Sequence, residues 1–186
     1  MANKKRTSAP KISLSSHRIA RAVALLLALV FALGSLISCA PHYGHCELGI
    51  RLRETYKDYD TGGAYDVAYS DGTMIVGVLR FSFAACLEAS IPITMTQHKW
   101  AEFYIKRAEG MENLSEIKTE GDTPYFTYNQ RGNDSVSYRY LVSFYITPNA
   151  YFVITFIYAE GYADKLEPEA LGYIRSVYLV ENYKAG

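Results

Sequence analysis

The sequence predicts an α+β domain in which helices flank a central antiparallel β-sheet. Two amphipathic helical patterns, at 97–109 and 164–177, interrupt a series of short segments rich in aromatic and β-branched residues. Turn signals such as Asp71-Gly72 separate neighbouring segments, as is typical of hairpins. The order is three strands, a helix, four strands and a helix, which favours an α+β fold over alternating parallel units.

The expected strands differ in their hydrophobic pattern. Segment 74–83 reads MIVGVLRFSF, and its apolar run predicts a central strand that is covered on both faces. Segments 136–147 and 151–158 are long and rich in aromatic and β-branched residues, so we expect them at the centre of the sheet. Four shorter strands are expected at 49–53, 65–69, 114–120 and 125–130.

Two helices are expected to cover the sheet. The first follows Thr96, a residue type that caps helix N-termini, and ends before Gly110. Its apolar stripe consists of Trp100, Ala101, Tyr104, Ile105 and Ala108. The second carries Pro168, which helices tolerate only near their first turn, so its regular part is expected to begin at Glu167.

The first 38 residues have the pattern of a cleavable signal peptide. Residues 1–21 contain six basic and no acidic side chains, and residues 22–33 read AVALLLALVFAL. The string Leu36-Ile37-Ser38-Cys39 resembles a bacterial lipobox, in which the cysteine is lipidated and becomes the first residue of the mature protein. We therefore expect a signal peptide at 1–38, a lipidated tether at 39–47 and a domain at 48–186. The resemblance places this domain outside the cytoplasm, attached to the cell membrane through a lipid on Cys39.

An uncleaved membrane anchor is the alternative for this segment. The apolar run from Ala22 to Ile37 has 16 residues. As a helix it would span about 24 Å, which is short of the ~30 Å hydrocarbon core. Either alternative places the domain outside the cytoplasm.

The charge distribution argues against nucleic-acid binding. From Cys39 onward the chain has 13 basic and 19 acidic residues, so this part carries a formal charge of 13 − 19 = −6. Binding to phosphates requires clustered lysine and arginine, which an acidic domain of this kind does not offer.

Two cysteines remain if Cys39 is lipidated. Cys46 and Cys86 would pair as a disulfide in an oxidising compartment, or Cys86 is a small buried apolar residue; the sequence leaves both open. His42, His45 and Cys46 form H-x-x-H-C, but the second ligand pair of a zinc site is missing. These residues are better interpreted as tether, and we expect no metal and no cofactor.

The order of elements resembles the PsbP-like fold. Four features are similar: an opening extended segment at 49–53, a hairpin that leads into the helix at 97–109, a Gly-Asp-Thr-Pro-Tyr turn at 121–125, and an Ile-Arg-Ser-Val-Tyr ending at 174–178. The resemblance implies an α/β/α sandwich that binds protein partners as an accessory subunit, and it brings no catalytic residues. The leader and Cys39 are also similar to those of small bacterial lipoproteins.

Tyrosine is the unusual feature of the composition, because all 17 tyrosines follow Cys39. The candidate binding face is Tyr125, Tyr128, Tyr138 and Tyr140; the alternative is that these rings fill the rim of a half-buried sheet. We expect a non-catalytic binding or accessory module with an envelope protein or glycan partner. One alternative is a small-ligand carrier or sensor with an aromatic pocket between sheet and helix. The other is an envelope enzyme that uses His98 or a carboxylate.

Overall fold

The computed structural model describes residues 43–107 and 111–180. The chain divides into two units, Met1–Cys39 and Ala40–Gly186, and all described residues belong to the second. The expected signal peptide, the lipidation site Cys39 and the tether as far as His42 lie outside the described residues.

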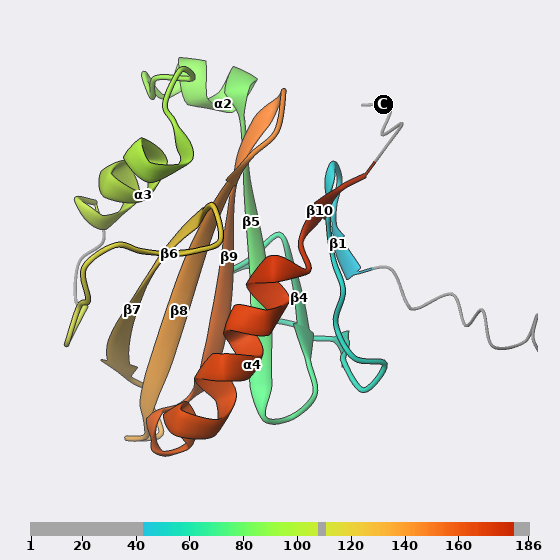
Figure 1. The fold of residues 1–186 in the computed structure, drawn as a ribbon, viewed down its shortest axis with the longest axis vertical. Helices are drawn as coiled ribbons and strands as arrows, with labels where there is room; N and C mark the ends of the chain where they lie inside the picture. Colours follow the sequence, from blue (N-terminus) through green and yellow to red (C-terminus); the bar gives the residue numbers. More distant parts are fainter. Residues whose placement is uncertain (1–42, 108–110, 181–186) are drawn as a thin grey trace, which may run out of the picture. The chain divides into compact units, whose positions relative to one another are not determined.

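The centre of the domain is one antiparallel sheet of seven strands in the order β3-β4-β5-β9-β8-β7-β6 (Figure 1). These strands are β3 (Lys57–Asp58), β4 (Val67–Ser70), β5 (Met74–Ser82), β6 (Lys118–Glu120), β7 (Thr123–Arg131), β8 (Ser137–Ile146) and β9 (Ala150–Ala159). A second sheet, in the order β1-β2-β10, is formed by β1 (Tyr43–His45), β2 (Leu48–Ile50) and β10 (Tyr178–Leu179).

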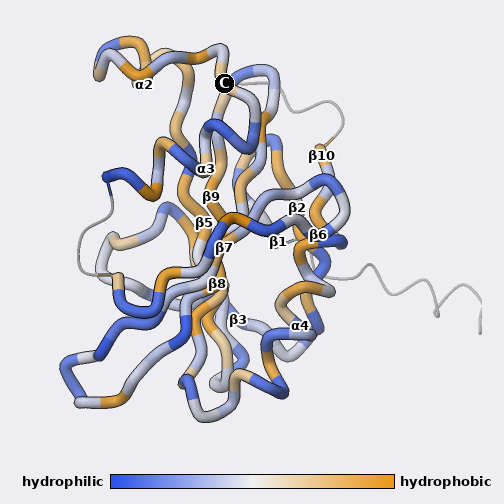
Figure 2. The backbone as a smooth tube through the Cα atoms, turned by 60° about the vertical axis from the view of Figure 1, so that its left-hand side comes forward, coloured by the Kyte–Doolittle hydropathy of each residue, from blue (hydrophilic) through white to orange (hydrophobic). Residues whose placement is uncertain are grey.

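The long aromatic strands lie in the middle of the sheet, as the sequence predicts. β9 lies between β5 and β8 and pairs with β5 from Met74↔Tyr158 to Ser82↔Ala150 without interruption. Figure 2 shows hydrophobic residues concentrated in these strands and hydrophilic ones in the outer loops. Nearly all of β9 is buried, because both of its faces are covered.

Helices lie on both faces of the sheet. The described helices are α2 (Phe83–Glu88), α3 (Gln97–Ile105) and α4 (Ala163–Arg175), and a short 3₁₀ helix, η1 (Glu160–Tyr162), precedes α4. Leu141 packs in the cluster under α4, whereas its neighbour Val142 packs in the cluster under α3, because successive strand residues point to opposite faces. The α+β class, with an antiparallel sheet between helices, is confirmed.

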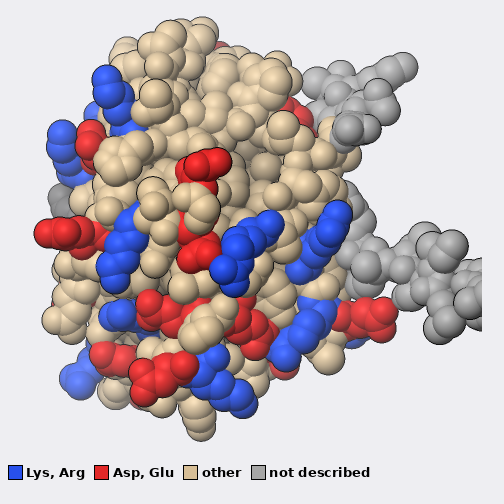
Figure 3. Space-filling model, in the orientation of Figure 1, with Lys and Arg blue, Asp and Glu red and all other residues tan. Residues whose placement is uncertain are grey.

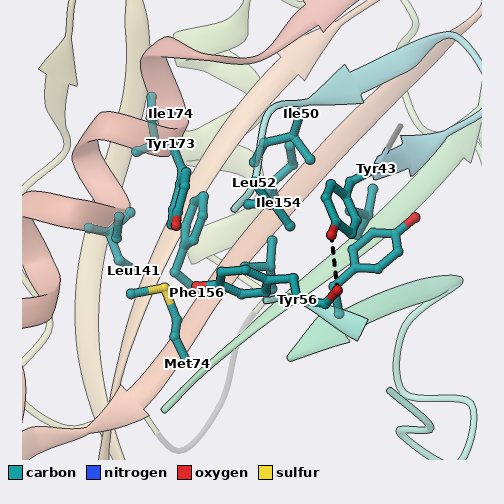
Figure 4. Packing of buried hydrophobic residues seen from close by; sticks show 14 of the residues in the cluster. Tyr43, Ile50, Leu52, Tyr56, Met74, Leu141, Ile154, Phe156, Tyr173 and Ile174 are labelled. Carbon is teal, nitrogen blue, oxygen red and sulfur yellow. Dashed lines mark hydrogen bonds between the residues drawn. The ribbon is translucent and has the colours of Figure 1, made fainter. Parts of the chain in front are cut away.

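The hydrophobic core under α4 also holds the N-terminal segment (Figure 4). Tyr173 of α4 stacks on Phe156 of β9 at 6.3 Å between ring centroids, and Tyr56 meets Tyr173 edge-on at 5.8 Å. The Tyr43 hydroxyl donates hydrogen bonds to the carbonyls of Arg53 and Tyr56 at 3.1 and 2.9 Å. These contacts fix the first described residue of the chain in the core.

The core under α3 is built around Trp100, which is 2% exposed. Its ring stacks on Tyr151 at 4.7 Å and meets Phe81 edge-on at 5.2 Å. Thr96 caps α3 as expected, since its hydroxyl oxygen accepts a hydrogen bond from the Lys99 N–H at 3.3 Å.

Several elements differ from the sequence prediction. α4 begins at Ala163 rather than at Glu167, so Pro168 lies inside the helix, where it cannot donate to the carbonyl four residues earlier. α2, β1, β3, β10 and η1 were not predicted, because each has only two to six residues and too few turns or alternations to give a periodic signal. α3 is regular only to Ile105.

Candidate functional site

An open groove of about 810 Å³ lies at one end of the central sheet. It forms where the β4–β5 turn, the segment after β2 and the start of α4 meet at the ends of β5 and β9. Its lining combines tyrosine rings, charged side chains and small aliphatic groups. The lining residues are Arg53, Thr55, Tyr59, Ser70, Asp71, Gly72, Thr73, Met74, Ile75, Tyr138, Ile157, Tyr158, Ala159, Tyr162, Lys165, Leu166 and Glu169.

All four aromatic residues that line the groove are tyrosines. Tyr162 is 64% exposed and Tyr59 is 46% exposed. Tyr138 is half-buried, and its hydroxyl donates a 2.6 Å hydrogen bond to Asp134, which raises the pKa of the phenol. Tyr158 is buried, and desolvation raises its pKa. The groove therefore offers two exposed rings and one half-buried ring to a ligand.

Arg53 is fixed at the rim by two carboxylates. Its Nη2 lies 3.0 Å from Asp71 Oδ2 and 2.5 Å from Glu169 Oε1, and the Tyr173 hydroxyl donates to the same Glu169 oxygen at 2.8 Å. The side chain of Arg53 is 54% exposed, so its outer face is open to a ligand. Lys165 makes no ion pair with any residue that the structure describes.

Asp71 also organises the β4–β5 turn. Its Oδ1 accepts hydrogen bonds from the Thr73 N–H at 2.9 Å, the Thr73 hydroxyl at 2.8 Å and the Met74 N–H at 3.0 Å. Burial acts to raise the pKa of Asp71, but these donors and Arg53 outweigh burial and lower it. The carboxylate thus stays ionised and shapes the turn that forms one wall of the groove.

Three of the four tyrosines of the predicted binding face share the α3 side of the sheet. Tyr128 and Tyr140 are cross-strand partners, and their rings stack at 4.7 Å with an interplanar angle of 12°. Tyr138 lies two residues from Tyr140 on β8, so its side chain lies on the same face, and it lines the groove. All three are half-buried.

Tyr125 does not belong to this face. It lies three residues before Tyr128 on β7, so its side chain points to the opposite side of the sheet. There it is 7% exposed and packs in the core under α4, where desolvation raises its pKa. The prediction of Tyr125 as a binding residue is wrong because alternation places it in the core.

Another tyrosine, Tyr65, extends this α3-side surface. Its ring covers Gly77 of β5, where an added Cβ would lie 2.5 Å from the ring. Burial raises the pKa of Tyr65 to about 12. A glycine at this position therefore lets the ring lie flat against the sheet.

The two cysteines of the described region are not paired. Cys46 is half-buried in the β1–β2 turn with φ +55°, and Cys86 is buried in the core under α3. Burial raises the pKa of the Cys86 thiol. The possible Cys46–Cys86 disulfide is therefore absent, and Cys86 is a small core residue.

The two described histidines, His45 and His98, do not line the groove. His98 is exposed on α3, 3.5 Å from Glu102 one turn later. His45 Nε2 lies 3.5 Å from the sulfur of Cys46, while His42 lies outside the described residues. Residues 43–107 and 111–180 contain no cluster of three or more His, Cys, Asp or Glu that is arranged to hold a metal ion.

No helix in the described part of the chain is long and apolar enough to cross a membrane.

The sequence matches no family model and no curated protein. Among solved structures, cyanobacterial PsbP (CyanoP) from Synechocystis sp. PCC 6803 is similar, with a TM-score of 0.48 and 16% identity over 75% of this chain and 92% of CyanoP. A protein from Bacteroides thetaiotaomicron is similar, with a TM-score of 0.47 and 12% identity over 75% of this chain. That match covers 47% of the other protein, so this chain spans about half of its length.

Most of the groove residues were missed by sequence analysis. Tyr59 and Tyr162 lie in irregular or 3₁₀ segments that are far apart in the chain, and both line the groove only because of the way the sheet is assembled. Arg53 and Glu169 carry no local motif. Two signals were available: the Asp71-Gly72 turn predicted the hairpin that forms a wall of the groove, and strand alternation gave Tyr138 as a candidate binding residue.

Proposed function

We propose that the protein is a bacterial lipoprotein that is tethered to the outside of the cell membrane through Cys39 and binds an envelope glycan without catalysing a reaction. The observation that carries the proposal is the groove, whose lining includes the exposed side chains of Tyr59 and Tyr162 and the rim residue Arg53. Aromatic faces suit the C–H faces of sugar rings, and a fixed guanidinium suits their hydroxyls.

The charge balance of the groove favours a neutral ligand. Arg53 and Lys165 are offset by Asp71 and Glu169, so the lining has no net formal charge. A volume of about 810 Å³ has room for several sugar units. The groove is open at its surface, which suits a polymer that passes through it.

The carboxylates of the groove support a non-catalytic role. Asp71 holds the β4–β5 turn, and Glu169 binds both Arg53 and Tyr173. A general acid needs a carboxyl group with a raised pKa, whereas the pKa of Asp71 is lowered. A carrier of a small ligand is the second candidate, because the groove volume lies within the usual range of roughly 300–1,000 Å³ for such pockets.

Two experiments test the proposal. The intact mass of the full-length chain from a bacterial host should correspond to a protein that starts at Cys39 and carries acyl chains, and Cys39→Ala should remove them. Isothermal titration should detect binding of chitotetraose, a neutral oligosaccharide. Tyr59→Ala and Tyr162→Ala should each weaken binding about 5- to 10-fold, or ~1–1.4 kcal/mol.

Leu114→Ala is the matched control, since Leu114 is 44% exposed and does not line the groove. Its affinity for chitotetraose should equal that of the unaltered protein. Absence of binding to both chitotetraose and insoluble peptidoglycan would rule out the glycan, and a tightly bound small molecule in the native mass spectrum would instead support the carrier.

A further inference from the structure

The end of the sheet opposite the groove differs from it in charge and hydrophobicity. β5 runs from Met74 in the groove to Ser82, so the two ends lie about 26 Å apart along the strand. The far end is formed by α2, the β8–β9 turn, the β1–β2 turn and β10. In Figure 1 these elements lie together, away from the β4–β5 turn and the start of α4.

Hydrogen bonds and an ion pair join the elements of this far end. The Phe83 N–H at the start of α2 donates to the Asn149 carbonyl of the β8–β9 turn at 2.9 Å. Glu47 of the β1–β2 turn pairs with Arg80 of β5 at 3.1 Å, and the Val180 N–H donates to the Glu47 carbonyl at 2.9 Å. These contacts attach the elements of the far end to one another and to the central sheet.

The far end exposes apolar side chains and few charges. Leu87 on α2 is 60% exposed and Leu179 on β10 is 56% exposed. From Phe81 to Gln97 the chain has one charged residue, Glu88. Figure 3 shows the upper end in tan, over α2, whereas positive and negative residues alternate over the middle and lower parts of this view.

The length of the tether limits where a lipid on Cys39 can lie. Tyr43, four residues after Cys39, is 5% exposed and hydrogen-bonded into the core. Four residues span at most about 14 Å, and β1 spans roughly 10 Å from Tyr43 to the β1–β2 turn. The anchor can therefore reach the level of the far end, but it cannot hold the domain away from the bilayer.

We propose that the domain rests on the lipid surface through its far end, with Leu87 and Leu179 in contact with the bilayer and the groove facing away. This inference rests on the proposed lipidation of Cys39. The segment that follows β2 lies equally close to Tyr43, but it carries Arg51, Arg53 and Glu54, which favour water. The acidic domain has no electrostatic attraction to anionic lipids, so apolar contact decides the orientation.

The test places a fluorescent label on the full-length lipoprotein in phosphatidylcholine vesicles. Cys46→Ser removes the half-buried thiol, and Cys86 is buried. An environment-sensitive dye is attached in turn to Leu87→Cys, Leu179→Cys and Val136→Cys. Val136 is the matched control, because it is an exposed apolar residue (41%) in the turn before β8, at the groove end of the sheet.

Labels at positions 87 and 179 should emit at shorter wavelength and be quenched by nitroxide-bearing lipids at least twofold more than the label at 136. Equal quenching at the three positions would overturn the proposed orientation. Protection of positions 87 and 179 that depends on protein concentration in the absence of vesicles would also overturn it, since a second copy would then cover this end.

The mass of each labelled preparation separates the two proposals. A preparation without acyl chains would refute the lipoprotein assignment itself. A fully acylated preparation with equal quenching at all three positions would refute only the orientation. The label at 87 in a protein that begins at Ala40, and so has neither the lipid nor the apolar segment 22–37, supplies the unanchored baseline for both comparisons.

Discussion

The buried ion pair between Glu47 and Arg80 attaches the N-terminal hairpin to the central sheet. Only 8% of the Glu47 side chain and 22% of the Arg80 side chain are exposed, and their charged atoms lie 3.1 Å apart. Glu47→Leu would leave the Arg80 guanidinium largely buried without its partner. We expect this variant to lose about 3 kcal/mol of unfolding free energy, and Arg80→Leu a similar amount.

The double variant should lose much less than the sum of the two single variants. With both charges removed, no buried ion remains without a partner, and leucine side chains can pack in their place. We expect a loss of about 1–3 kcal/mol against a sum of ~6, and so a coupling energy of about 3–5 kcal/mol. Urea unfolding followed by the fluorescence of Trp100, the single tryptophan, measures each value.

The exposed pair between Arg175 and Glu120 is the matched control. Its atoms are closer, at 2.7 Å, but 62% of the Arg175 side chain is exposed. Solvent screening should reduce its coupling energy below ~1 kcal/mol. A Glu47–Arg80 cycle that is additive within about 0.5 kcal/mol would refute burial as the cause of the coupling.

The pH dependence of stability gives an independent check on Glu47. Burial acts to raise its pKa, but donors on Thr147, Arg80 and Asn149 outweigh burial and lower it. A carboxyl whose pKa is lower in the folded state contributes stability above its unfolded pKa of about 4.3 and loses it as pH falls through the folded value. Glu47→Leu should therefore flatten the acid side of the stability curve.

Three further predictions concern the packing of the fold. Gly44→Ala should destabilise the domain by about 2–4 kcal/mol, because φ is +144° and the added Cβ would collide with a carbonyl of β2. Gly172→Ala should instead stabilise the domain by ~0.5–1 kcal/mol in the same urea assay, because the space around this position in α4 is free. Trp100→Ala should cost about 3–5 kcal/mol, measured by circular dichroism, and a loss below 1 kcal/mol would contradict its core position. Reduction should leave the intact mass unchanged, and a thiol reagent should modify Cys46 much faster than Cys86; a gain of two hydrogens would show a disulfide.

Sequence periodicity was sufficient for the long elements of the fold. Segments 74–83, 136–147 and 151–158 correspond to β5, β8 and β9, because each carries enough apolar residues to show both its type and its burial. The helix at 97–109 was recognised from its cap and stripe. α3 ends at Ile105 and a turn follows at Lys106 and Arg107, while residues 108 and 109 lie outside the described residues.

The start of α4 could not be predicted from local rules. Pro168 favours a helix that begins within one turn before it, yet α4 starts at Ala163. Leu166 and Ala170 are buried on either side of the proline, and they pack in the core under α4. Tertiary packing of this face thus outweighs the loss of one hydrogen bond.

The candidate site, like the start of α4, could be predicted only in part from local sequence patterns. Alternation along β8 correctly placed Tyr138 and Tyr140 on one face of the sheet. The predicted binding face also included Tyr125 and Tyr128 of β7, which are three residues apart and therefore point to opposite faces. Tyr59 and Tyr162 lie about 100 residues apart in the sequence. That both residues line one groove depends on the strand order, which no local pattern encodes.

The Glu47–Arg80 pair also links the anchor to the direction in which the groove faces. It joins the β1–β2 turn to β5, and the unbroken pairing of β5 with β9 extends from there to Met74 in the groove. If the anchor holds the far end at the bilayer, loosening this pair should change the orientation of the domain without changing the groove. Glu47→Leu should therefore lower the quenching at position 87 in vesicles and leave the affinity for chitotetraose unchanged. A loss of glycan affinity in this variant would show that the two ends are coupled through the sheet.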